Sequence, residues 1–197
     1  MTTTRRRATD RALATAAAAA LLTGGLAVAV PVAASAAPQD CAYMGYGSAP
    51  DKLGLQFDTE ERALANAINA YRAQNGKAAL RESAILARPT MWASLDDARR
   101  GIAPSDHIDT RGMGPAQRAD FCAGYKGAIG EINYWGFGGG TLNNDFGKWQ
   151  AALDWWKKSA PHNALLLSTA YTTFSVARAY IGVNAEKCFW TVDFGTS

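Results

Sequence analysis

The chain has 197 residues, with 20 lysines and arginines against 17 acidic residues and only two histidines, His107 and His162. Residues 1–36 hold four of the arginines and one aspartate, so the rest of the chain carries 16 basic and 16 acidic residues (20 − 4 and 17 − 1). A near-neutral mature chain argues against nucleic-acid binding, which needs a basic surface.

The first 36 residues follow the pattern of a secretory signal peptide. A basic segment from Arg5 to Arg11 precedes an almost uncharged run from Ala12 to Val32, and Ala34-Ser35-Ala36 forms a small-x-small cleavage site. A membrane anchor is the alternative, because the run is long enough to span a bilayer. The cleavage site favours a secreted, extracellular protein that begins near Ala37 and keeps no stable membrane span.

Residues 37–57 are expected to be irregular, and a single domain is expected over 58–197. Hydrophobic periodicity with Gly and Pro signals predicts helices at about 58–76, 83–100, 115–124 and 144–159, with a short apolar helical turn at 161–167. Strands are expected at 128–135, 172–181 and 188–194, the last two as an antiparallel hairpin. This alternation predicts an α/β fold, a three-layer α-β-α sandwich with a small antiparallel sheet.

Local sequence signals mark the ends of two of these helices. Asp58 can cap the first helix, with Glu61 as its reciprocal partner in a capping box. Pro89 either kinks the second helix or marks its true start, and Gly101 ends it. The polar loop that follows carries His107.

Five features in a fixed order resemble the CAP superfamily of cysteine-rich secretory, antigen 5 and pathogenesis-related 1 (SCP-like) proteins, its bacterial secreted branch above all. They are Ile68-Asn69-Ala-Tyr-Arg72 with Gly76 and Leu80, the loop residue His107, Gly130-Glu131, Trp156-x-x-Ser159-x-x-His162-Asn163, and Phe189-Trp190-Thr-Val-Asp-Phe194-Gly195. The resemblance covers roughly residues 60–195 and implies an α-β-α sandwich with a surface cleft.

The resemblance implies a cleft lined by His107, Glu131, Ser159 and His162. The chain departs from the family pattern in two places. Ile132 replaces the asparagine that follows the family glutamate, and Ser159 stands near the position of a second acid. Two imidazoles and one carboxylate could hold zinc or another divalent metal, so His107, His162 and Glu131 are the expected ligands. Glu131 is also the candidate catalytic residue, as a general base.

Each of these residues also has a purely structural interpretation. His107 could be a hydrogen-bonding loop residue, and His162 could start a helix without binding a ligand. Glu131 could pair with Arg118, and Ser159 could cap the short helix that follows it.

The three cysteines are Cys41, Cys122 and Cys188, and export favours one disulfide with one thiol left over. Three pairings are possible. A Cys122–Cys188 bond is expected, because both residues lie at the edges of predicted regular elements.

The expected function is that of a secreted, monomeric binding or interaction module with a His/Glu cleft able to hold a divalent metal. Its partner would be a lipid, cell-wall or protein ligand. A metal-dependent hydrolase acting on peptide, ester or cell-wall bonds is the alternative, weakened by the missing second acid at Ser159.

Overall fold

The computed structural model describes residues 58–137, 147–181 and 187–196, all within the compact unit Ala36–Ser197. The predictions for residues 1–36 and 37–57 lie outside these ranges. In the described part of the chain, no helix is both long and apolar enough to cross a membrane.

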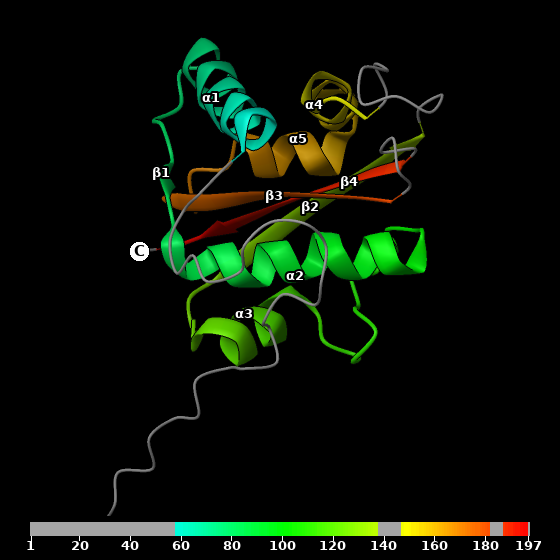
Figure 1. Cartoon of the computed structure of the whole chain (residues 1–197). Helices are drawn as coiled ribbons and strands as arrows, with labels where there is room; N and C mark the ends of the chain where they lie inside the picture. Colours follow the sequence, from blue (N-terminus) through cyan, green and yellow to red (C-terminus); the bar gives the residue numbers. More distant parts are fainter. Residues whose placement is uncertain (1–57, 138–146, 182–186, 197) are drawn as a thin grey trace, which may run out of the picture. The chain divides into compact units, whose positions relative to one another are not determined.

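Five helices and four strands form the described unit (Figure 1). The helices are α1 (Thr59–Gln74), α2 (Ala84–Arg100), α3 (Pro115–Ala123), α4 (Trp149–Lys158) and α5 (Ala160–Leu166). The strands are β1 (Arg81–Glu82), β2 (Ile129–Phe137), β3 (Thr173–Ile181) and β4 (Lys187–Gly195).

The helix ends follow the local signals in the sequence. The side chain of Asp58 accepts the backbone N–H of Glu61 at 2.7 Å, and Glu61 accepts that of Asp58 at 2.9 Å, which completes the predicted capping box. Gly101 ends α2 with a left-handed φ of 70°, a conformation that glycine adopts without steric cost. Pro89 lies inside α2 rather than at its start.

The sheet has the order β1-β3-β4-β2. The predicted hairpin of β3 and β4 is confirmed, and β2 also pairs antiparallel with β4. The sheet is mixed rather than purely antiparallel, because β1 joins it parallel to β3. With only two residues, β1 is too short to leave a periodic pattern in the sequence.

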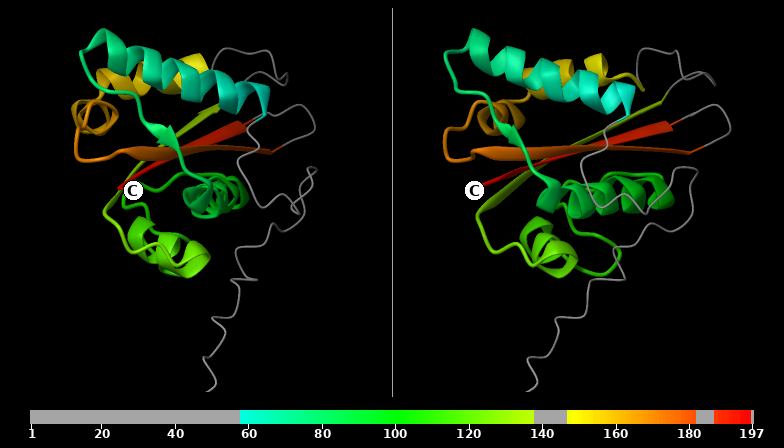
Figure 2. Two further views of the ribbon diagram at one scale, coloured as in Figure 1. Left: turned by 90° about the vertical axis from the view of Figure 1, so that its left-hand side faces the viewer. Right: turned by 60° about the vertical axis from the view of Figure 1, so that its left-hand side comes forward.

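The sheet separates two helical layers, as Figures 1 and 2 show from three sides. Helices α1, α4 and α5 cover one face, and α2 and α3 cover the other, so the predicted three-layer arrangement is confirmed. Strand β4 is buried on both faces, and its side chains alternate between the two layers. Cys188, Trp190, Val192 and Phe194 join the core under α1 and α4, whereas Phe189 packs toward α2.

The same alternation shows that the expected Cys122–Cys188 disulfide is wrong. Cys188 is a free, buried thiol in the core under α1 and α4. Cys122, on α3, packs against Trp92 of α2 on the opposite face of the sheet. Two cysteines on opposite faces of a sheet cannot reach the short separation that a disulfide needs.

Candidate functional site

The loop after α2 holds His107 in an unusual backbone conformation. His107 has a φ of 60°, and it is the one non-glycine residue with positive φ in the described ranges. This left-handed conformation costs an L-residue with a bulky side chain roughly 1–2 kcal/mol. Asp109 stabilises the loop by accepting the backbone N–H groups of Arg111 (2.9 Å) and Met113 (2.8 Å). Strained residues of this kind concentrate at functional sites.

Glu131, on the edge strand β2, contacts both His107 and Arg118. The Nδ1 of His107 lies 2.9 Å from one carboxylate oxygen of Glu131, and the guanidinium of Arg118 on α3 donates to the other. Glu131 and Arg118 are both buried. Glu131 therefore forms the ion pair with Arg118 that the sequence allowed, and the same carboxylate also contacts His107.

This arrangement fixes the charge of Glu131. Burial alone would raise its pKa, but the hydrogen bond with His107 and the positive charge of Arg118 outweigh burial and lower it. Glu131 is therefore an ionised acceptor, and His107 donates its Nδ1–H to it. In the neutral ring, the other nitrogen of His107, Nε2, carries the lone pair.

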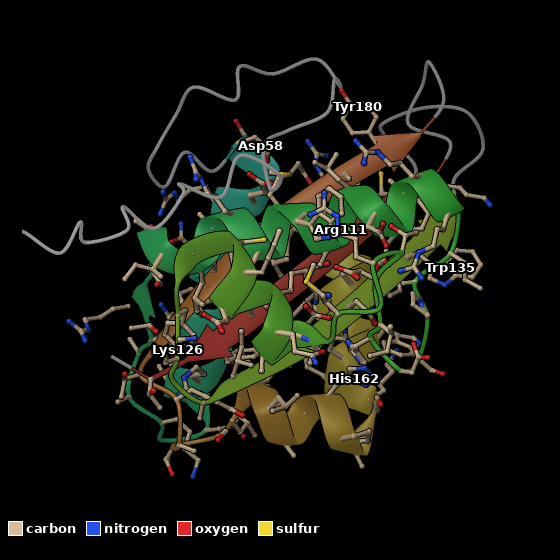
Figure 3. The ribbon with its side chains drawn as sticks, turned by 90° about the horizontal axis from the view of Figure 1, so that it is seen from below. Asp58, Arg111, Lys126, Trp135, His162 and Tyr180 are labelled. Carbon is tan, nitrogen blue, oxygen red and sulfur yellow. The ribbon has the colours of Figure 1, made fainter. Side chains whose placement is uncertain are left out.

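His162 lies in α5, at the β2 edge of the sheet. Seen from the α2 and α3 side, it is visible beyond β2 (Figure 3). Its Nδ1 is 2.6 Å from the hydroxyl of Ser159, and its ring centroid is 4.7 Å from that of Trp155. Burial lowers the pKa of His162 and favours its neutral imidazole, and protonation of His107 would lower that pKa further.

Ser159 occupies the N-cap position of α5, as expected, but its side chain makes no capping hydrogen bond. The hydroxyl contacts His162 instead. Both histidines are thus held through Nδ1, His107 by Glu131 and His162 by Ser159. Within the described residues, neither Nε2 has a hydrogen-bond partner.

Glu131 does not fit the role of metal ligand that the sequence suggested. Both of its oxygens already accept hydrogen bonds, one from His107 and one from Arg118. Across the described ranges, no group of three His, Cys, Asp or Glu side chains is arranged to hold a metal ion. Among the predicted site residues, His107 and His162 each keep a ring nitrogen, Nε2, that has no hydrogen-bond partner in the described residues.

His107 and Glu131 line a small cavity of about 10 Å³, which is room for about one water molecule. The ionisable residues that line it are Asp96, Asp97, Arg100, His107, Asp109, Arg118 and Glu131. Burial, followed by the charge of Glu131, raises the pKa of Asp97 to about 7. This cavity therefore holds more acidic groups than the sequence analysis assigned to the site.

Two further residues of the site were missed by the sequence analysis. Trp155, on α4, is 47% exposed and contacts Tyr134 (5.9 Å between ring centroids) as well as His162. Asp193, on β4, faces the same helical layer as Glu131. The alternation along Trp190-Thr-Val-Asp-Phe194, with polar residues at every second position, was the available signal for Asp193.

Comparisons with known proteins give structural relatives only. No protein-family model and no curated protein sequence matches the chain. An outer surface protein from Borrelia burgdorferi superposes with a TM-score of 0.58 at 18% identity, covering 73% of this chain and 98% of that one. An extracellular protein containing an SCP domain from Bacillus anthracis superposes with a TM-score of 0.55 at 17% identity, covering 70% of this chain. The match spans 40% of that longer protein. At these identities the likeness concerns the fold, and this chain has a CAP-like fold.

Proposed function

We propose that the chain is a secreted, extracellular binding module whose cleft holds a divalent metal between His107 and His162. Export is supported by the signal pattern of residues 1–36 and by structural neighbours that are described as outer surface and extracellular proteins. A bound metal would supply a Lewis-acidic centre to which a cell-wall, lipid or protein ligand could attach.

The observation that carries this proposal is that each imidazole ring is held by a hydrogen bond at its Nδ1 atom. Metal-binding histidines donate their second ring N–H to a carboxylate, a carbonyl or water, which fixes the tautomer and the ring orientation. Glu131 has this relation to His107. Ser159 has it to His162 in the tautomer whose Nδ1 carries the proton and donates it to the hydroxyl. The lowered pKa of His162 keeps that ring neutral, as a ligand must be.

The geometry favours binding over the hydrolase alternative. A general base needs an oxygen within hydrogen-bond reach of the proton it removes. Both oxygens of Glu131 instead accept from buried or half-buried donors of the protein itself. Trp155, exposed beside His162, gives the cleft an apolar surface on which a ligand can lie.

Zinc titration calorimetry tests the proposal with the wild type, His107→Asn and His162→Gln. Asparagine tolerates the left-handed backbone at position 107, so the first variant removes a ligand without adding strain. Outer partners of metal ligands typically contribute 10–100-fold in affinity, and we expect each ligand variant to lose more than about 100-fold. Asp106→Asn is the matched control in the same loop, because it keeps an oxygen for the backbone N–H of Ile108. No wild-type binding, or equal affinities in all four proteins, would contradict the metal site.

We also propose that Cys41 and Cys122 form the disulfide of the exported protein. Cys188 is a free thiol, so these two are the cysteines that remain in a chain of three. Cys41 lies outside the described residues, and Cys122 is fully buried on α3. This bond would tie the N-terminal segment to the helix that also supplies Arg118.

A further inference from the structure

The β2–β4 ladder places two carboxyl groups directly opposite each other. Glu131 pairs with Asp193 in the antiparallel register, and side chains at such positions lie about 4.5–5.5 Å apart at Cβ. Asp193 is 0% exposed. Two ionised carboxylates in contact and away from water would repel each other strongly, so such pairs share a proton.

The partners of Asp193 show which of the two carboxyl groups holds that proton. One oxygen of Asp193 accepts the hydroxyl of Thr90 at 2.9 Å. The other oxygen, Oδ1, is buried and finds no donor in the described part of the chain. An ionised Asp193 would leave the buried Oδ1 without a donor, which costs free energy that a protonated carboxyl group avoids. A protonated Asp193 donates instead, and Glu131 is the acceptor across the ladder.

We infer that Asp193 is a buried neutral carboxylic acid that donates its O–H to Glu131 and thereby holds Glu131 in place for His107. Asp193 is a positioning residue: it acts on the proposed metal site through Glu131. Glu131 then accepts from three elements of the fold, namely from Asp193 on β4, from Arg118 on α3 and from His107 in the loop.

The electrostatics of the layer agree with this assignment. Burial, followed by the negative charge of Glu131, raises the pKa of Asp193 well above its ordinary value, and a hydrogen bond with Glu131 raises it further. The same hydrogen bond lowers the pKa of Glu131. Arg118 opposes the shift of Asp193, but its guanidinium donates directly to Glu131. The proton therefore stays on Asp193.

Infrared spectroscopy of the metal-free protein tests the inference directly. At pH 7 the wild type should show a carboxylic C=O stretch that disappears in Asp193→Asn, and the difference between the two spectra removes the contributions of other acids. Asn can replace a neutral donor, so Asp193→Asn should keep the His107 Nδ1–H tautomer, as read from ¹⁵N shifts. Asp193→Leu, which removes the donor, should lose that tautomer preference.

Ser175→Ala is the matched control. Ser175 is opposite Asp193 on β3, and it is fully buried with a hydroxyl that has no hydrogen-bond partner in the described residues. It should keep both the infrared band and the tautomer. A difference spectrum between the wild type and Asp193→Asn that lacks a carboxylic C=O band would overturn the inference. The experiment contains no zinc, so failure of the metal proposal would leave these results unchanged.

Discussion

Replacing Arg118 with methionine should be among the most destabilising single changes in the site. Arg118 is 1% exposed. It pairs with Glu131 and donates to the backbone carbonyl of Met113 at 3.2 Å. Methionine fills a similar volume but leaves the buried, ionised Glu131 without its guanidinium partner. Removing one member of a buried ion pair costs about 3–5 kcal/mol, which corresponds to a fall in Tm of roughly 6–20 °C for a domain of this size.

Urea denaturation at pH 7 gives the magnitude, and a double-mutant cycle with Glu131→Gln tests the cause. In the double variant neither charged partner of the ion pair remains. Its loss in free energy of unfolding should therefore be smaller than the sum of the two single losses. Lys126→Met is the matched control, because Lys126 forms its ion pair with Asp120 on an exposed surface and such pairs contribute at most about 1 kcal/mol. A loss below about 1 kcal/mol in Arg118→Met, or strictly additive losses in the cycle, would refute this reasoning.

Three further predictions concern other parts of the domain. Burial raises the pKa of Glu61 to about 7, so its contribution to stability is full below its unfolded pKa of 4.5 and is lost as pH rises through 7. Glu61→Gln keeps the capping box, so the stability of the wild type relative to this variant should fall between pH 5 and pH 8 in urea denaturation; a constant difference would show that Glu61 does not titrate there. His107→Gly should relieve backbone strain and cost less stability than His107→Ala in thermal denaturation, and the reverse order would mean that the left-handed backbone is not strained. Non-reducing peptide mapping of the secreted protein should recover Cys41 linked to Cys122, with Cys188 alkylated only after unfolding; a linked Cys188 peptide would contradict the fold as described.

Much of the fold could be predicted because its signals are local. The Asp58–Glu61 capping box involves residues three positions apart, and the β3–β4 hairpin joins neighbouring segments. The predicted helix at 144–159 begins later in the structure, at Trp149 after the N-cap Lys148; residues 138–146 lie outside the described ranges.

The errors arose where a residue's surroundings depend on distant parts of the chain. Trp155 and Trp156 are consecutive on α4, so they point about 100° apart, and the core takes Trp156 while Trp155 remains half exposed. The disulfide was mispredicted because the face to which Cys188 points depends on the register of β4 in the sheet. The spacing of residues in the sequence also could not show that both carboxylate oxygens of Glu131 accept hydrogen bonds from Arg118 and His107. These contacts join a strand to a helix and to a loop.

The central claim is that the Nε2 atoms of His107 and His162 together hold a divalent metal. A crystal of the wild-type protein grown with zinc, with anomalous data collected above and below the zinc absorption edge, tests this claim most directly. The account predicts one strong peak at about 2.0–2.1 Å from both Nε2 atoms, with Glu131 still bound to His107 and Arg118. A peak bound to the Glu131 carboxylate, or no peak between the two imidazoles, would contradict it.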